Sequence, residues 1–251
     1  MKRLCPLLFL LPLPSGAALL PASPPPALAS VVVEDLAALQ KEYAQAVRKH
    51  EQALKSAPDR DARRALRKNP PAKAFWSRFL ATSESEPQAI VWLLVNAGDA
   101  GLGIQELDDT KLALYHRALT NHAAADWIGG VLDRMPRDRR ALGAKLHEYC
   151  GLVLEQNASA DLKAQALYTR YAVLARSKAE GDAELAEKLL VQLRDSYGDA
   201  AFVQKDEVYR RLFLSAGNLA PDFDGRTIDG HEFKLSDYRG KIVLIDFYGF
   251  W

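Results

Sequence analysis

The chain is poor in the residues that metal and nucleophile chemistry usually needs. It has only two cysteines and five histidines among its 251 residues. It contains no glycine-rich phosphate loop, no His-Glu-x-x-His pair and no serine nucleophile elbow. His147 and Cys150 lie three residues apart, but a zinc site needs three or four ligands. We therefore expect a packed histidine beside a buried, inert cysteine, with no metal and no cofactor.

An excess of charge of one sign is also missing. The chain has 33 Lys and Arg residues against 32 Asp and Glu residues, a formal net charge of +1. A nucleic-acid or acidic-membrane partner usually requires a clear basic excess. The composition, with 49% hydrophobic and 26% charged residues, is that of an ordinary globular protein. The overall balance therefore indicates neither kind of partner, and we expect no nucleic acid.

Residues 1–29 have the pattern of a signal peptide. Lys2 and Arg3 precede a mostly apolar stretch, and Ala27-Leu28-Ala29 forms a small-x-small cleavage site. The alternative is a membrane anchor. Prolines and a glycine interrupt the apolar stretch, whereas a spanning helix needs roughly 20 apolar residues. We therefore predict an exported protein of the periplasm or cell envelope, with no membrane span after cleavage.

Residues 30–215 are predicted to form a helical domain. The stretch Glu34–Ala57 is rich in strong helix formers, and its apolar residues recur at three- and four-residue spacing. Pro58 ends this helix. Pro70-Pro71 opens the next one, because proline suits the first turn of a helix. Further helices are expected over 86–96, 109–121, 124–134, 139–155, 160–179, 183–197 and 199–214.

The predicted helices at 160–179 and 183–197 are joined by a short turn. Their apolar residues can face one another across it: Leu162, Ala166, Tyr171 and Leu174 against Leu185, Leu189, Leu193 and Tyr197. Such hairpins resemble tetratricopeptide-like units, but no second copy aligns at a fixed period of about 34 residues. We therefore predict an irregular all-helical domain, with a tetratricopeptide-like solenoid as the alternative.

Three smaller features of the helical region have structural interpretations. The tryptophans at 76, 92 and 127 are expected in the core. The run Arg137-Asp138-Arg139-Arg140 is expected to be a solvated helix start, where an aspartate is favourable near the positive end of the helix dipole. Asn157-Ala158-Ser159 fits the glycosylation pattern, but we expect a bare turn.

The sequence changes character at residue 216. Pro221 prevents a helix from continuing, and Asp229-Gly230 signals a two-residue β-hairpin turn. Lys241–Tyr248 is nearly continuous apolar, β-branched and aromatic sequence, which is typical of a strand buried on both faces. Residues 216–251 are therefore predicted to begin an α/β sheet with a hairpin and a central strand. The chain as a whole is predicted to be mainly α.

The order of motifs in this last segment resembles the opening of a thioredoxin-like domain of the redoxin family. The resemblance covers residues 217–251 and consists of Ala220-Pro221-Asp222-Phe223, the Asp229-Gly230 turn, the stretch Leu235–Lys241, and Asp246-Phe247-Tyr248 followed by Trp251. Tyr248 and Phe250 depart from the residues usual at those positions. The resemblance implies that residues 216–251 are an incomplete thioredoxin-like domain.

The resemblance also implies a thiol–disulfide oxidoreductase chemistry. In the family, the residue after the tryptophan is usually the first cysteine of a Cys-x-x-Cys pair, which exchanges with protein thiols or disulfides. Trp251 would shield that sulfur, and Asp246 matches a buried carboxylate that takes part in proton transfer. Signal cleavage would leave Cys150 as the single thiol, so no intramolecular disulfide can form. We therefore expect the chain as given to be an inactive fragment whose cysteines lie beyond Trp251.

Two alternatives remain open. A peroxiredoxin-type antioxidant peroxidase needs a lone cysteine in a Pro-x-x-x-Thr-x-x-Cys run. The residues before Trp251 contain neither that proline nor that threonine, so the oxidoreductase is favoured. The other alternative is a helical partner-binding scaffold without enzymatic activity, because most of the sequence is predicted to be helical.

Overall fold

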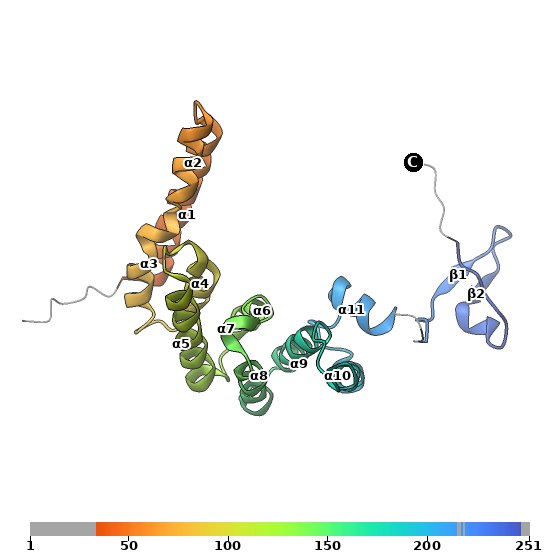
Figure 1. The fold of residues 1–251 in the computed structure, drawn as a ribbon. Coiled ribbons are helices and arrows are strands. Elements are labelled where there is room, and N and C mark those ends of the chain that lie inside the picture. Colours follow the sequence, from red (N-terminus) through yellow and green to blue (C-terminus); the bar gives the residue numbers. More distant parts are fainter. Residues whose placement is uncertain (1–33, 215–216, 218, 247–251) are drawn as a thin grey trace, which may run out of the picture. The chain divides into compact units, whose positions relative to one another are not determined.

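The computed structural model describes residues 34–214, 217 and 219–246. The predicted signal peptide over 1–29 and the expected site residue Trp251 lie outside these residues. The described part is mainly α with a small two-stranded sheet, which confirms the predicted fold class (Figure 1). Its helices are α1 (Leu36–Ser56), α2 (Arg60–Lys68), α3 (Pro71–Thr82), α4 (Ala89–Asn96), η1 (Ala97–Asp99), α5 (Ile104–His122), α6 (Ile128–Arg134), α7 (Arg139–Leu142), α8 (Lys145–Gln156), α9 (Ala160–Leu174), α10 (Asp182–Tyr197), α11 (Asp206–Phe213) and η2 (Leu235–Tyr238). The strands are β1 (Asp224–Arg226) and β2 (Glu232–Lys234).

Side-chain caps and prolines fix the first helices. The Asp35 carboxylate accepts the Ala38 backbone N–H at 3.0 Å, which caps α1. Pro71 occupies the first turn of α3, as predicted. The sequence reasoning missed α2, because its residues are mostly charged. The Asp59 carboxylate caps this helix by accepting the Ala62 N–H at 2.7 Å.

Several of the predicted helices were too long. The helix predicted over 160–179 ends at Leu174, and the one predicted over 124–134 begins at Ile128. The stretch predicted over 139–155 is split into α7 and α8 at Gly143, whose φ of +50° is outside the helical range. The last helix begins at Asp206 rather than at 199, because turns occupy the residues before it. Glycine readily adopts positive φ, so the break at 143 follows from the residue type.

The larger hydrophobic core is built around aromatic side chains from α1, α3 and α4. The rings of Phe79 and Trp92 stack with centroids 3.6 Å apart, and Tyr43 meets Trp92 edge-on at 4.9 Å. Trp76 and Trp127 are half-buried and also pack against this core. The expectation that the tryptophans are core residues is therefore confirmed.

A second core lies between α9 and α10, which pack together as the predicted helical hairpin. Tyr171 and Leu174 share this core with Leu189 and Leu193, in agreement with the pairing read from the sequence. Ala166 and Leu162 instead pack in the larger core. The helix α9 therefore contributes side chains to both cores. Leu185, which was predicted to face α9, is exposed and belongs to neither core.

Within residues 34–214, 217 and 219–246, no helix combines the length and hydrophobicity that crossing a bilayer requires.

Candidate functional site

The residues that carry the family resemblance form a compact β-hairpin, which we call the hairpin segment and define as residues 219–246. Strands β1 and β2 are antiparallel, and Gly225 lies opposite Phe233. A backbone bond from the Leu235 N–H to the Phe223 carbonyl, 3.1 Å, extends the ladder toward η2. The hairpin predicted from the sequence is thus present.

The turn of this hairpin differs from the expected two-residue turn. Thr227 donates its N–H to the carbonyl of His231 at 2.8 Å, and the Gly230 N–H donates to the Thr227 carbonyl at 2.9 Å. Residues 228–230 therefore form a three-residue loop. Gly230 has a φ of +85°, which is the left-handed conformation that such loops require at their last position. Gly230 is therefore needed at the third position of this loop, whereas the Asp229-Gly230 signal predicted it at the second position of a two-residue turn.

Gly225 is needed because an aromatic ring covers it. A Cβ atom at this position would lie 2.4 Å from Cζ of Phe233, far inside normal contact. The Phe233 ring in turn meets Tyr238 edge-on, with centroids 5.9 Å apart. Lys241 Nζ lies 5.7 Å from the centre of the Tyr238 ring. A glycine and two aromatic rings therefore hold η2 against the hairpin.

Two of the sequence motifs are joined by Asp222 and Ser236. One carboxylate oxygen of Asp222 accepts the Ser236 backbone N–H at 2.8 Å, and the other accepts its hydroxyl at 2.7 Å. Both bonds lower the pKa of the Asp222 carboxyl from its ordinary value, and the bond from the Ser236 hydroxyl has the larger effect. The motif around Pro221 and the motif beginning at Leu235 therefore occur together for a structural reason.

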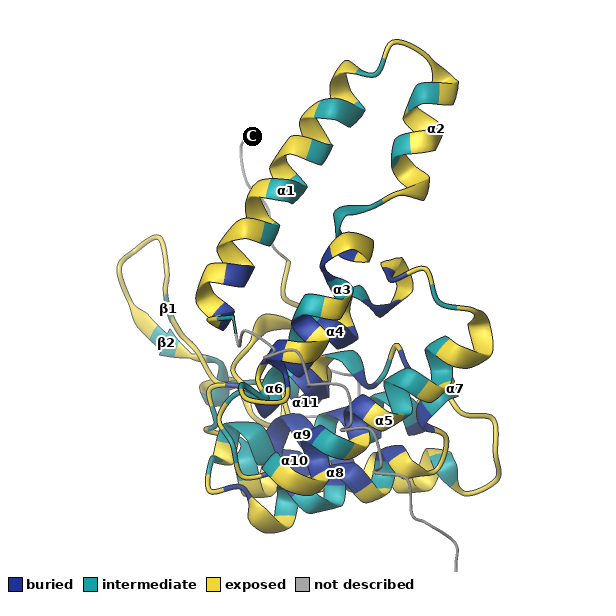
Figure 2. Cartoon of the chain, turned by 90° about the vertical axis from the view of Figure 1, so that its left-hand side faces the viewer, coloured by how far each residue is buried: buried dark blue, intermediate teal, exposed yellow. Residues whose placement is uncertain are grey.

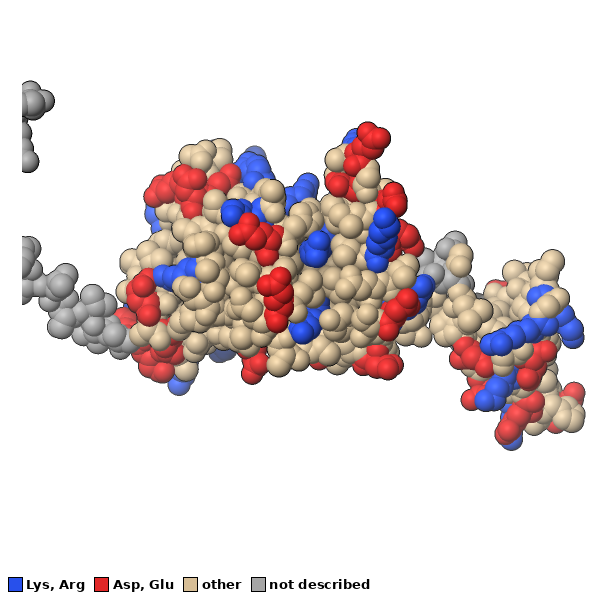
Figure 3. All heavy atoms as spheres, turned by 90° about the horizontal axis from the view of Figure 1, so that it is seen from below, with Lys and Arg blue, Asp and Glu red and all other residues tan. Residues whose placement is uncertain are grey.

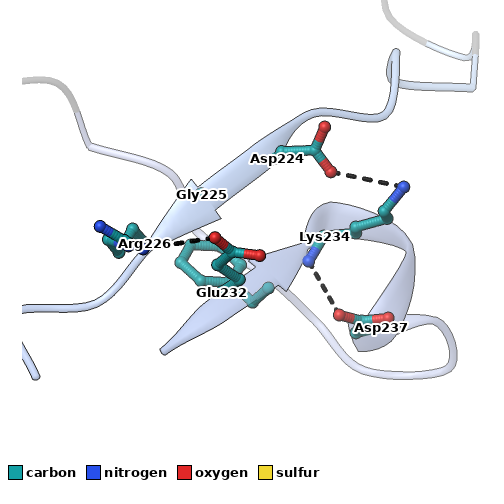
Figure 4. Close-up of a pocket in the computed structure, with 7 residues that line it drawn as sticks. Asp224, Gly225, Arg226, Glu232, Lys234 and Asp237 are labelled. Carbon is teal, nitrogen blue, oxygen red and sulfur yellow. Dashed lines mark hydrogen bonds and ion pairs between the residues drawn. The ribbon is translucent and has the colours of Figure 1, made fainter. Parts of the chain in front are cut away.

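Charged side chains line a recess on the hairpin, shown in Figure 4. Lys234 Nζ lies 3.4 Å from Asp224, Arg226 lies 3.4 Å from Glu232, and the Asp237 carboxylate accepts the Lys234 N–H at 2.8 Å (Figure 4). Figure 3 shows acidic and basic side chains interleaved over this segment. The pairs are exposed, so each contributes little to stability. The described residues that line the recess include no cysteine, serine or threonine.

The central strand expected over Lys241–Tyr248 does not form in its described part. Residues 241–246 belong to no strand, and Ile242 and Leu244 are 104% and 93% exposed. Asp246 is exposed as well, and its burial in a completed domain stays a prediction. The physical reason why the strand does not form is the absence, among the described residues, of neighbouring strands that pair with this segment and cover its faces.

Cys150 lies in the larger hydrophobic core, and His147, three residues before it, is half-buried. Cys150 is fully buried in α8, and burial raises the pKa of its thiol to about 12. Burial also lowers the pKa of His147, with the charge of Arg170 acting in the same direction. In the described part of the chain, no group of three or more His, Cys, Asp or Glu side chains is arranged to hold a metal ion. Because its thiol is buried and the pKa of that thiol is raised, Cys150 is a poor nucleophile.

The interpretation of Asp138 as part of a solvated helix start was wrong. Its side chain is buried; one carboxylate oxygen lies 2.6 Å from Lys111 Nζ, and the other accepts the Tyr115 hydroxyl at 2.8 Å. Burial and the neighbouring Asp138 charge raise the pKa of Tyr115. The cluster ties α5 to the start of α7. Its members are distant in sequence, so no local pattern indicated it.

Asn157 forms a structured turn, in line with the expected bare turn. Its side chain is 3% exposed, and its amide donates to the Ala123 carbonyl at 2.8 Å. Ser159 caps α9 by accepting the Leu162 N–H at 3.4 Å. The asparagine amide is therefore engaged inside the fold.

Comparison with known proteins relates a short stretch of this chain to thioredoxin-like thiol–disulfide oxidoreductases. The thiol-disulfide oxidoreductase ResA of Geobacillus kaustophilus is 50% identical over 38 residues, which are 15% of this chain and 22% of the relative. ResA of Geobacillus thermodenitrificans is 45% identical over a stretch of the same length. The match thus spans about a fifth of the length of these relatives. No protein-family profile and no solved structure matches the chain.

Proposed function

We propose that residues 217–251 are the first part of a thioredoxin-like domain in an exported thiol–disulfide oxidoreductase. The observation that carries the proposal is the 50% identity over 38 residues to a thiol-disulfide oxidoreductase. The length of that match is close to that of the segment 217–251. The bonds between Asp222 and Ser236 support the proposal, because they show that two of the resembling motifs form one structural unit.

The proposed mechanism assigns a role to each part of the segment. The hairpin would hold the start of the strand at residues 241–248 against the sheet of the complete domain. The strand would then deliver Trp251 to a loop that precedes a helix, where a cysteine follows. The helix dipole and free N–H groups at such a position lower the pKa of a thiol. The resulting thiolate attacks a disulfide of the partner protein, which forms a mixed disulfide and releases one partner thiol. The second cysteine then attacks the mixed disulfide, which releases the other partner thiol and leaves a disulfide between the two cysteines of the domain.

Asp246 has a role only in the completed domain. Pairing of the 241–248 strand with its neighbours would bury this carboxylate, which is exposed in the described residues. We propose that it then accepts the proton of the second cysteine. The helical domain at 30–215 would position the partner protein, and the segment at 1–29 would direct export to the periplasm or cell envelope.

The experiment is to extend the chain. Sequencing the DNA downstream of the Trp251 codon should reveal a Cys-x-x-Cys motif, and the extended protein should reduce insulin disulfides in the presence of dithiothreitol. The 251-residue chain is the matched control and should have background activity. In the extended protein, Asp246→Asn should lower the rate at neutral pH, while Asp229→Asn in the hairpin turn should leave it unchanged.

Two outcomes would overturn the proposal. Insulin reduction by the 251-residue chain itself would mean that the chemistry does not need residues beyond Trp251. A downstream sequence without cysteine would remove the oxidoreductase assignment and leave the helical partner-binding scaffold. A lone downstream cysteine that consumes hydrogen peroxide would instead identify a peroxiredoxin-type peroxidase. The name of the matched relatives favours the oxidoreductase over that alternative.

A further inference from the structure

Four arginines form a continuous row on α2. Arg60, Arg63, Arg64 and Arg67 have the i, i+3, i+4, i+7 spacing of a single helix face. All four are exposed, whereas the opposite face of α2 is half-buried and α2 contacts α1. Figure 2 shows α2 drawn mostly in the exposed colour. We call these four residues the arginine row.

The guanidinium groups of the arginine row are available to a partner. The ion pairs within the described residues include none of the four. Arg78, by contrast, is held between Glu34 and Glu42. The acid that precedes the row, Asp59, already accepts the Ala62 N–H at 2.7 Å as a helix cap.

The fold does not require this concentration of charge. None of the residues of α2 is buried, and the buried residues of α1 are Leu36 and Leu39, at the far end of that helix from α2. The arginine row therefore takes no part in the packing of a hydrophobic core. Its charges can be removed without opening a cavity.

The positive charge is local, which the composition of the whole chain conceals. Residues 48–68 contain eight Lys or Arg residues and three Asp or Glu residues, a net charge of +5, while the whole chain has a net charge of +1. The overall balance gave no indication of an acidic partner. The distribution of charge along the fold does indicate one.

We propose that the arginine row binds an anionic phospholipid surface. Guanidinium groups bind phosphate oxygens through two parallel hydrogen bonds, and a straight row of about 10 Å on a helix suits a planar array of headgroups. Residues 48–68 contain no Phe, Trp or Tyr, so the surface lacks the stacking residues of single-stranded nucleic-acid sites. The exposed face of α2 also lacks large apolar side chains, which predicts adsorption at the surface without insertion.

A second copy of the chain is the rival occupant. Residues 180–207 contain eight acidic and three basic residues, a net charge of −5. Several of these acids are already paired locally, namely Glu184 with Lys188, Asp195 with Arg194 and Asp206 with Arg210. The four arginines form no ion pair among the described residues, whereas these three acids each form one. The observations therefore favour an external phosphate surface as the partner of the arginine row.

The test is co-sedimentation of the full chain with vesicles. Binding to phosphatidylglycerol–phosphatidylcholine vesicles is compared with binding to pure phosphatidylcholine vesicles, at two salt concentrations. The test variant is Arg60→Gln, Arg63→Gln, Arg64→Gln and Arg67→Gln together. The matched control removes four exposed charges that likewise belong to none of the ion pairs among the described residues: Arg137→Gln, Arg139→Gln, Arg176→Gln and Lys178→Gln. Any binding through the apolar residues 4–20 is common to all variants and to both kinds of vesicle.

The proposal expects binding to the anionic vesicles to exceed binding to the phosphatidylcholine vesicles. The affinity for the anionic vesicles should weaken about fivefold for each arginine removed, and it should fall with added salt because exposed charges are screened beyond about 10 Å at 0.1 M. The control variant should bind like the unaltered chain. Equal binding by the four-glutamine variant would overturn the proposal, as would equal binding to both kinds of vesicle. Tighter binding to duplex DNA, or self-association lost in the variant, would assign the row to another partner and overturn it too.

Discussion

Lys111 and Asp138, 27 positions apart in the sequence, form a largely buried ion pair with Nζ and Oδ1 2.6 Å apart. The other oxygen of Asp138 accepts the Tyr115 hydroxyl. Two side chains of α5 therefore hold the residue that begins α7. This arrangement makes the stability of the helical domain depend on one carboxylate.

Replacing Asp138 by alanine should lower the free energy of unfolding by about 3 kcal/mol, because the substitution leaves Lys111 buried without its counter-charge. Urea unfolding followed by circular dichroism measures the change. Glu184→Gln is the matched control, because it breaks an exposed ion pair with Lys188 and should leave the unfolding midpoint unchanged. An Asp138 variant as stable as the unaltered chain would contradict the structural role.

Replacing Gly225 by alanine should disrupt the hairpin segment, because the added Cβ would overlap the Phe233 ring. Overpacking of this kind typically costs 1–3 kcal/mol, so amide hydrogen exchange in β1 and β2 should accelerate about tenfold or more. Adding Phe233→Ala to the Gly225 variant should remove the overlap. Alanine at Gly98, where a Cβ meets no atom within 4 Å, is the control. Unchanged exchange in the Gly225→Ala variant would show that the ring does not lie over the glycine.

Acid should release the bond between Asp222 and Ser236. The folded pKa of Asp222 is lowered, so its stabilising contribution is present above the ordinary value of 3.8 and is lost as the pH falls through the lower folded value. Ser236→Ala removes the hydroxyl donor and should move the pKa back toward 3.8. Carboxyl carbon chemical shifts measured against pH report both effects. Ser56→Ala in α1 serves as control, and an Asp222 pKa indifferent to Ser236→Ala would disprove the link.

Cys150 should resist thiol reagents in the folded chain. Its pKa of about 12 keeps it protonated at pH 8, and it is fully buried. Iodoacetamide labelling followed by peptide mass mapping distinguishes Cys150 from Cys5. Labelling of Cys150 should be undetectable in native buffer and complete in denaturant. Rapid native labelling would mean that α8 opens locally.

The sequence was most informative where residue type acts locally. Pro71 opened a helix and the apolar spacing located the α9–α10 pair, because both effects operate within a few residues. Periodicity did not find α2, since a helix stabilised by its cap and by contact with α1 needs few apolar residues. Gly143 was read as part of one helix, because an isolated glycine inside a helical pattern is tolerated at a cost of about 1 kcal/mol and does not by itself mark a helix end.

Contacts between distant residues were beyond local reasoning. The environment of Asp138 is set by Lys111 and Tyr115, which the folding of α5 brings to it. The hairpin was predicted correctly as an element, but the reason for Gly225 appears only when the Phe233 ring is placed. The segment at 241–246 shows the converse case. Its residues suit a central strand, but among the described residues no strand pairs with this segment, and strand formation depends on such neighbours.

Ile242, Val243, Leu244 and Ile245 are consecutive, uncharged and at least partly open to solvent, at 104%, 43%, 93% and 43% exposure. A run of this kind can stack with identical runs from other molecules into cross-β fibres. Lys241 and Asp246 bracket it with charges that act as gatekeepers against such stacking. Concentrated preparations of this chain should therefore form fibres most readily in high salt, where those two charges no longer hold neighbouring molecules apart.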